Sequence, residues 1–252
     1  FDIAAALVGG AHTIALTSAL PDITDAVVID GSTEPDAGAL GRPVIELSGQ
    51  NAGVLADGLT LAAGSGGSTI RGLAINRFHD GIVVTADSDG NLIVGNRIGT
   101  DVTGAIDRGN THIGVYVLGD ANTIGGADAA DRNVVSGNDG YGIFVSNGWS
   151  GGSDNWIAGN FIGVDAAGTT ALGNGFNGVY LGGGSDNRVG GVNPGEGNVI
   201  SANGDIGLRL EGAQSTRIEG NRIGTDATGS VLLGNVAVGV SLHFGTTGTV
   251  LG

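Results

Sequence analysis

The stretch GNRIGTDVTG at residues 95–104 decides the fold, because the chain contains three versions of it. It returns as GNFIGVDAAG at residues 159–168 and as GNRIGTDATG at residues 220–229. The three copies begin at residues 95, 159 and 220, so they are spaced 64 and then 61 residues apart. Self-similarity at a nearly fixed period is typical of repeat proteins, in which each unit packs only against its neighbours. The sequence therefore predicts a solenoid.

A shorter repeat lies inside the long one and predicts the strands. A glycine followed by an apolar, a variable and an apolar residue occurs as GLTL (58), GIVV (81), GVYV (114), GIFV (142), GVYL (178), GLRL (207) and GVSL (239). Such alternation is typical of a short strand with one buried face. A second apolar position follows at Ile70, Ile93, Ile124, Ile157, Val189, Ile218 and Val250. A third short strand then follows, for instance NVVS at 133 or NVIS at 198.

Three short strands per unit cannot bury their apolar faces alone, so the units must stack. This pattern resembles the right-handed parallel β-helix of the pectin-lyase-like superfamily, and especially the Gly- and Asn-rich repeats of large bacterial surface proteins. We therefore expect an all-β fold, a single-stranded right-handed parallel β-helix with three short strands per rung. The superfamily contains both enzymes and inert stalks, so the resemblance implies a fold and leaves the chemistry open.

The repeats predict one β-helix domain over residues 1–252, with less regular rungs over 1–57 and regular rungs over 58–252. The sequence begins at Phe1 and stops inside a repeat, which favours a fragment of a longer chain. Exposed strand edges at the ends of such a coil tend to pair with other chains. We therefore also expect head-to-tail self-association.

The composition excludes several classes of function. The chain has 52 glycines, 20 Asp and 5 Glu against 10 Arg, and neither Lys nor Cys, for a net charge of −15. An acidic chain lacks the basic surface that binds nucleic acid. No apolar run approaches the roughly 18 residues of a membrane-spanning helix, so membrane insertion is not expected. The pattern fits a secreted or cell-surface protein of bacterial type.

The enzyme signatures of the superfamily are absent. The sequence contains neither the motif series of polygalacturonases nor the Asp-Pro-His-Glu motif of alginate epimerases. The lack of lysine excludes lyase sites that use a Lys base. No cofactor is expected, apart from calcium at one acidic loop. That loop, ADSDGN at 86–91, places Asp87, Asp89 and Asn91 around a glycine like the first half of an EF-hand. Ile98 stands where an EF-hand has its Glu, so an acidic turn is the alternative.

Asparagine and aspartate recur at fixed places in the repeats. One Asn precedes each third strand on five rungs, at Asn96, Asn133, Asn160, Asn198 and Asn221. Stacked Asn side chains can form hydrogen-bonded ladders along a coil, which is the structural role we expect. The aspartates Asp101, Asp165 and Asp226 each stand three residues before a glycine, which is typical of a turn.

The outward position of the Gly-apolar-x-apolar strands carries a stripe of aromatic residues. Along the coil this position reads Thr60, Val83, Tyr116, Phe144, Tyr180, Arg209 and Ser241. Trp149 and Trp156, in the stretch SNGWSGGSDNW at 146–156, are expected to flank the stripe. Stacked rings stabilise neighbouring strands, and exposed rings also pack against sugar faces, so both roles stay open.

Three polar residues beside the stripe are candidates for acid–base chemistry. Arg209, Glu211 and His243 stand next to Tyr180 in the predicted register. A glycoside hydrolase needs two carboxylates at a defined separation, and Glu211 has no evident partner in the sequence. The pair His79 and Asp80 is also suggestive, although it lies in a predicted turn.

Two functions follow from these residues. The first is a non-catalytic structural or adhesive module that binds a polysaccharide or cell-surface glycan through the aromatic stripe. The alternative is a polysaccharide lyase or glycoside hydrolase that acts on an extended sugar chain. An enzyme requires a cleft, whereas the insertions between the predicted strands are short.

Overall fold

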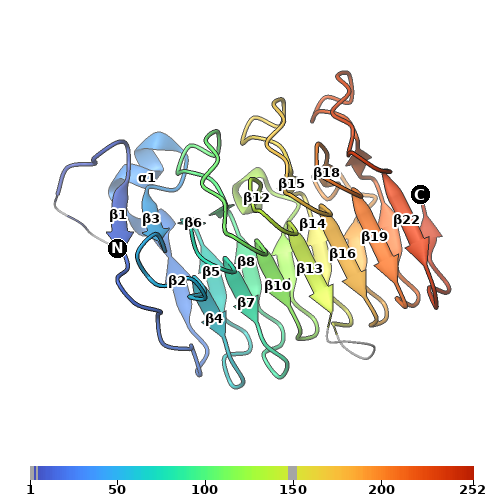
Figure 1. Ribbon diagram of the computed structural model, residues 1–252, viewed down its shortest axis with the longest axis horizontal. Helices are drawn as coiled ribbons and strands as arrows, with labels where there is room; N and C mark the ends of the chain where they lie inside the picture. The colour runs from blue at the N-terminus through green and yellow to red at the C-terminus, as the bar shows by residue number, and fades with distance from the viewer. Residues whose placement is uncertain (1–2, 4, 147–151) are drawn as a thin grey trace.

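The chain forms an elongated coil of parallel strands in a computed structural model that describes residues 3, 5–146 and 152–252 (Figure 1). From Leu59 to Ile223 each rung contributes one strand to each of three sheets, in the order sheet 2, sheet 3, sheet 1 along the chain. The coil axis runs horizontally in Figure 1, from the N-terminal rungs at the left to the C-terminal rungs at the right. The predicted all-β parallel β-helix with three strands per rung is confirmed.

The strands of the three sheets alternate along the chain. Sheet 1 contains β1 (His12–Ala15), β3 (Ile45–Ser48), β6 (Leu73–Asn76), β9 (Arg97–Ile98), β12 (Val134–Val135), β15 (Phe161–Ile162), β18 (Val199–Ile200) and β21 (Arg222–Ile223). Sheet 2 contains β4 (Leu59–Leu61), β7 (Ile82–Val84), β10 (Val115–Val117), β13 (Ile143–Ser146), β16 (Val179–Gly182), β19 (Leu208–Glu211) and β22 (Val240–His243). Sheet 3 contains β2 (Val28–Asp30), β5 (Thr69–Arg71), β8 (Leu92–Val94), β11 (Thr123–Gly125), β14 (Trp156–Ala158), β17 (Arg188–Gly190), β20 (Arg217–Glu219) and β23 (Val250–Leu251).

The interior consists of aliphatic columns beneath the three sheets. In β10, Val115 and Val117 face inward and are fully buried, while Tyr116 between them faces outward. The same alternation repeats from rung to rung, because each strand pairs in register with the next. One continuous apolar core results, as expected for units that can bury their faces only by stacking.

The last member of the sheet 3 column differs from the sequence prediction. The register places Leu251 beside Ile218 and Val250 beside Arg217, so Leu251 and not Val250 continues the column. Neighbouring residues of a strand point to opposite faces, so an error of one residue exchanges the inward side chain. The prediction of Val250 was therefore wrong by one position.

Three asparagine ladders run along the corners of the coil. The ladder predicted from the sequence is confirmed: each Asn donates its backbone and side-chain N–H groups to the side-chain oxygen of the next, as Asn133 does to Asn160 at 3.3 and 2.9 Å. Two further ladders are formed by Asn91, Asn122, Asn155 and Asn187 and by Asn110, Asn138, Asn174, Asn203 and Asn235. They follow the same rule, except that Asn155 donates only its backbone N–H to Asn187. The ladders satisfy buried backbone groups at the corners, where no sheet partner is available.

The three copies of the ten-residue phrase lead from sheet 1 into three arms, at residues 99–110, 163–174 and 224–235, which project from the same side of the coil (Figure 1). Successive arms contact each other, since Ala166 N–H donates to the Gly104 carbonyl at 2.9 Å and Ala227 N–H to that of Gly168 at 2.8 Å. The predicted turn at Asp101 is present, because Gly104 N–H donates to the Asp101 carbonyl at 2.9 Å.

Short helices occupy two corners between sheet 3 and sheet 1. The first corner carries η1 (Gly31–Thr33) and α1 (Pro35–Leu40), and a later corner carries η2 (Ala129–Asp131). Within residues 3, 5–146 and 152–252, none of the helices is long and apolar enough to cross a membrane.

Candidate functional site

The outward face of sheet 2 holds the aromatic stripe. The register aligns Tyr116, Phe144, Tyr180 and Arg209 on four consecutive strands, β10, β13, β16 and β19. All four side chains are partly exposed. The parallel register brings equivalent positions of neighbouring rungs about 4.8 Å apart, which is why a one-rung repeat in the sequence becomes a row of touching rings.

Two aromatic residues that the sequence analysis did not select join this row. Tyr141 and Phe176 precede β13 and β16, and their rings stack with centroids 5.6 Å apart. Tyr141 also contacts Phe144 and Tyr180 edge to face, at 5.0 and 5.8 Å. Phe144 and Tyr180 are nearly parallel, with centroids 4.6 Å apart and an interplanar angle of 11°, and Tyr116 meets Phe144 at 5.4 Å.

We call these five rings the aromatic platform: Tyr116, Tyr141, Phe144, Phe176 and Tyr180. Phe176 is 53% exposed, and the other four residues are half-buried. A signal for the two missed residues was available, because Tyr141 and Phe176 stand 35 residues apart, about one rung, and each lies just before a strand glycine or its neighbouring Asn.

A polar group, formed by Arg209 and Glu211 of β19, borders the platform on its C-terminal side. The Arg209 guanidinium donates to the Glu211 carboxylate at 2.7 Å, and the Tyr180 hydroxyl donates to the same oxygen at 3.3 Å. The Arg209 guanidinium also lies 5.8 Å from the centre of the Tyr180 ring. Burial raises the pKa of Tyr180, and the Glu211 carboxylate raises it further. These residues can bind hydroxyl groups beside the rings.

His243 stands apart from this polar group. It pairs in register with Glu211 on the neighbouring strand, but its Nε2 lies 2.8 Å from the Ser241 hydroxyl on its own strand. The structure therefore joins Arg209 and Glu211 to Tyr180 and gives His243 a different contact. A catalytic role for any of the three stays a prediction.

The two tryptophans do not both flank the platform. Trp156 belongs to β14 in sheet 3, between Thr123 and Arg188, so its expected place beside the sheet 2 stripe was wrong. Its indole N–H donates to the Gly190 carbonyl at 2.9 Å, and the Arg188 guanidinium lies 5.3 Å from the ring centre. The chain turns a corner between β13 and β14, which sequence distance alone does not reveal. Trp149 lies outside the described residues.

A histidine cluster lies on the N-terminal side of the platform. We use this name for His79, His112, Asp80 and Asp57. The two imidazole rings stack with centroids 4.8 Å apart. His112 Nδ1 lies 2.9 Å from an Asp80 carboxylate oxygen, and His79 Nδ1 lies 3.5 Å from both Asp80 and Asp57. Burial raises the pKa of Asp57, and the nearby Asp80 charge adds to that shift.

The histidine cluster and the platform form one continuous surface. The backbone column that carries His79 and His112 continues two rungs later through Phe176, whose N–H donates to the Gly140 carbonyl at 2.9 Å. Burial raises the pKa of Tyr116, and the charge of Asp80 contributes to this shift, so the two groups are within electrostatic reach. His79 and His112 are 33 residues apart, which is one rung.

The histidine cluster has the donor chemistry of a transition-metal site. One ring nitrogen of each His and one Asp80 oxygen lie within 4.8 Å of one another. Imidazole and carboxylate ligands suit copper and zinc, whose ligand atoms stand about 3.3 Å apart in a tetrahedral site. The His112 side chain is half-exposed, and the Asp80 side chain is buried. A second such group, His12, Glu34 and Asp36, lies near α1.

The predicted calcium loop has a partly different role. Asn91 belongs to an asparagine ladder, where its side-chain oxygen accepts from the Ser68 N–H at 2.9 Å. Asp89 accepts from the Asp120 N–H at 2.7 Å, and Asp87 has a left-handed backbone with φ 67°. The acidic turn is therefore present, and calcium binding at Asp87, Asp89 and Asn91 stays a prediction.

Comparisons with known proteins agree with this architecture. The family model described as "Periplasmic copper-binding protein (NosD)" matches residues 47–237, three quarters of the chain. Two solved structures of the periplasmic alginate epimerase AlgG, a single and a double mutant, each superpose with a TM-score of 0.52, at 17% and 16% sequence identity. These matches cover 85% and 83% of this chain but only 44% and 43% of the epimerase chains, so this chain spans less than half their length. A comparison with curated proteins finds no match.

Proposed function

The chain belongs to the NosD family of periplasmic copper-binding proteins, and on that premise we propose that it is a β-helix module of the cell envelope, secreted or surface-exposed, that binds a glycan on the outer face of sheet 2 without cleaving it. One observation carries this proposal. Five aromatic rings contact one another on the outer face of sheet 2, and each is at least partly exposed. Exposed apolar patches of this kind mark interaction sites, since a monomer gains nothing from leaving them in water.

The platform suits a sugar chain in shape and chemistry. Aromatic rings offer a large, rigid apolar surface at low entropic cost, and the near-parallel Phe144 and Tyr180 form a flat area. Arg209 and Glu211 at its edge offer a donor and an acceptor for sugar hydroxyls. The net charge of −15 repels polyanions, which favours an uncharged glycan. The structural neighbours are named for their action on alginate, a sugar polymer, and they supply an analogy of fold only.

A binding assay tests the proposal. The purified chain is titrated with a panel of neutral and acidic polysaccharides, and affinity is measured by calorimetry or by retention on the immobilised glycan. We expect Tyr180→Ala to weaken binding about tenfold, equivalent to about 1.4 kcal/mol. Phe244→Ala is the matched control, because Phe244 is 86% exposed but makes no ring contact with the platform. Equal loss in both variants, or binding to no glycan, contradicts the proposal.

The same samples separate binding from catalysis. New reducing ends or unsaturated uronates would indicate turnover by a hydrolase or a lyase. If turnover is observed and is lost in Glu211→Gln and Arg209→Gln, the chain is an enzyme and the proposal of a non-catalytic binding module is wrong. Binding without any product supports the module.

The histidine cluster supports a second candidate function, binding of copper. The specific observation is the set of two stacked imidazoles and a buried carboxylate with donor atoms within 4.8 Å, in a chain whose family is named for copper. The Asp80 carboxylate lies 2.9 Å from His112 Nδ1, so these two donors already stand side by side. His79, His112 and Asp80 would hold the ion.

Copper binding is tested with Cu²⁺ alone. We expect one Cu²⁺ per chain, with electron paramagnetic resonance showing two nitrogen ligands. His112→Gln and His79→Gln each weaken binding at least tenfold. His243→Gln is the control, because His243 lies in a strand of sheet 2, outside the cluster, and contacts Ser241. A loss of equal size in the control would indicate unspecific binding, and an unchanged affinity in both cluster variants would exclude the site.

A further inference from the structure

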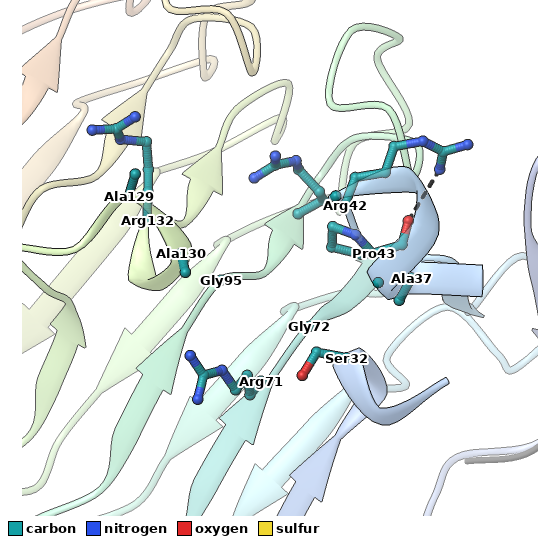
Figure 2. A pocket seen from close by; sticks show the side chains of 13 residues that line it. Ser32, Ala37, Arg42, Pro43, Arg71, Gly72, Gly95, Ala129, Ala130 and Arg132 are labelled. Atoms are coloured by element: carbon teal, nitrogen blue, oxygen red, sulfur yellow. Dashed lines mark hydrogen bonds between the residues drawn. The ribbon is translucent and has the colours of Figure 1, made fainter. Parts of the chain in front are cut away.

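A cavity of about 290 Å³ opens on the opposite side of the molecule from the platform face, at the corner between sheet 3 and sheet 1 (Figure 2). Its floor is the bare corner of two neighbouring rungs, at Gly72 and Gly95. Both glycines have positive φ, 68° and 66°, which makes the tight corner possible. Its two walls are the corner insertions, with α1 on one side and η2 on the other.

The side chains around this cavity are strongly biased toward positive charge. Four of the ten arginines of the chain line it: Arg42, Arg71, Arg97 and Arg132. The remaining lining residues are Ser, Ala, Gly and Pro, and none of the described residues that line it carries a carboxylate. Figure 2 shows Arg42, Arg71 and Arg132 rising from three different segments around the pocket. In a chain with 25 acidic residues, this local excess runs against the overall charge.

Most of these guanidinium groups have only neutral partners. Arg42 donates to the carbonyls of Pro43 and Gly10 at 3.0 and 3.2 Å. Arg132 donates to the Gly159 carbonyl at 3.0 Å, and its guanidinium lies 4.2 Å from the centre of the Phe161 ring. These contacts hold the side chains in place without neutralising them.

Among the described residues, an acidic ion-pair partner is present for Arg71 alone of the four: Asp131 of η2, at 3.0 Å. Asp101 on the first arm is within electrostatic reach of Arg97, although its carboxylate accepts hydrogen bonds from its own arm. Counting both carboxylates against four guanidinium groups leaves two positive charges. An anion with two negative charges balances this excess.

Arg97 is the least satisfied member of the group. Its Nε is buried and makes no hydrogen bond, and no described residue forms an ion pair with it. Burial, together with the positive charges of Arg132 and Arg42, lowers the pKa of Arg97 to about 10. Holding a guanidinium in this state is unfavourable unless a ligand supplies the missing acceptor.

We propose that this arginine pocket binds a divalent tetrahedral oxyanion, phosphate or sulfate, either free or as an ester on a small molecule. Guanidinium groups match the oxygens of such anions through two parallel hydrogen bonds each. The cavity exceeds the size of a bare phosphate, so the ester of a sugar-sized molecule also fits. The pocket lies on different sheets from the platform, so this ligand is independent of the proposed glycan.

The chain provides a closely matched control for Arg97. The first and third copies of the ten-residue phrase both contain Asn-Arg-Ile-Gly, which places Arg222 in β21 at the same outward position as Arg97 in β9. Arg222 is exposed, and it does not line the cavity. A loss of binding in Arg97→Gln but not in Arg222→Gln therefore reports the pocket rather than the overall charge.

The experiment is a calorimetric titration with inorganic phosphate, sulfate, a hexose 6-phosphate and galacturonate, at constant ionic strength in chloride. We expect phosphate or sulfate to bind in the unmodified chain, Arg97→Gln to weaken that binding at least tenfold, and Arg97→Lys to restore part of it. Tighter binding of the hexose phosphate identifies an ester, and equal binding identifies the free anion.

Three results would overturn the proposal: no binding of any phosphate or sulfate probe, equal losses in Arg97→Gln and Arg222→Gln, or tighter binding of the monovalent galacturonate. Thermal unfolding without ligand checks that the variants fold. Because Arg97 lacks a partner, Arg97→Gln should unfold at no lower temperature than the parent chain, which separates a ligand-binding role from a structural one.

Discussion

The outer faces of sheet 1 and sheet 2 both carry aromatic residues, which are buried on sheet 1 and partly exposed on sheet 2. Phe161 in β15 of sheet 1 and Phe144 in β13 of sheet 2 both occupy outward positions, within the same rung of the coil. Phe161 is only 7% exposed, because it packs against Val164 of the second arm. Val134 and Val199 flank it on the adjacent strands β12 and β18. Phe144 keeps part of its ring in water as a member of the platform.

The difference comes from where the repeat places its insertions. The arms follow the sheet 1 strands and fold back over them, so apolar side chains on that face become a second small core. Among the described residues, which leave out 147–151 after β13, no arm follows a sheet 2 strand, and the outward aromatic residues of that sheet stay partly exposed. An outward aromatic residue thus stabilises the fold when it lies on sheet 1 and is available for binding when it lies on sheet 2.

The largest expected effect is the contrast between two Phe→Ala substitutions. Phe161→Ala removes a buried ring from the second core and should lower the free energy of unfolding by about 3–5 kcal/mol. Phe144→Ala removes a half-exposed ring and should cost about 1–2 kcal/mol, mainly through its contacts with Tyr116, Tyr141 and Tyr180. Urea unfolding measures both values.

The binding assay gives the reverse order for the same pair. Phe144→Ala should weaken glycan retention, whereas Phe161→Ala should leave it unchanged in the folded protein. If both substitutions cost the same stability and neither affects binding, the two faces are equivalent and the comparison fails.

The second expected effect concerns the packing of the arms on sheet 1. Gly168 has φ 72°, and a Cβ there would lie 2.6 Å from the Ala227 Cβ and 2.8 Å from the Phe161 ring. Gly168→Ala should therefore lower the free energy of unfolding by about 1–3 kcal/mol. Gly229→Ala is the matched control in the third arm, because Gly229 also has a positive φ, 77°, but a Cβ there would meet only the Arg222 side chain, at 3.5 Å. Equal unfolding midpoints for the two variants would show that the arms are not tightly packed.

The sequence predicts the regular part of the molecule well. Strands follow from the two-residue alternation, and the ladder from Asn96 to Asn221 follows from its one-rung spacing, because each rung repeats the same local chemistry. The aromatic stripe follows from the same argument. Trp156 was assigned to the wrong face because its distance along the chain hides a corner between sheet 2 and sheet 3.

The irregular parts were not predictable in the same way. The arginine pocket depends on two insertions that stand as walls, and their direction is decided by packing rather than by period. Its four arginines are 29, 26 and 35 residues apart, at positions 42, 71, 97 and 132, so a search for rung-spaced charges would have selected them. The pair His79 and His112 is also separated by one rung and would have been selected in the same way.

The smallest expected effect is a difference in pH response between the two faces. On the arm side, burial alone raises the pKa of Asp101, but hydrogen bonds from Thr103, Ile106 and Ala105 outweigh it and leave the pKa below its usual value. A carboxyl whose pKa is lowered by folding contributes stability above the unfolded pKa of about 3.9, and this contribution is lost as the pH falls further. Acid should therefore loosen the first arm before the platform, visible as faster amide exchange at Ala105 and Ile106.

On the platform side the pKa shifts have the opposite sign, so stability is lost at high pH instead of low pH. Burial raises the pKa values of Tyr116 and Tyr180, so their stabilising contribution is intact below the unfolded value of about 10 and is lost as the pH rises through the folded values. Absorbance of the three tyrosines during an alkaline titration should show late ionisation, and Tyr180→Phe should remove one late step. Amide exchange in the arms should stay unaffected by that substitution. Ionisation of all tyrosines near pH 10, with no late step, would mean that the platform is more open to water than its ring contacts imply.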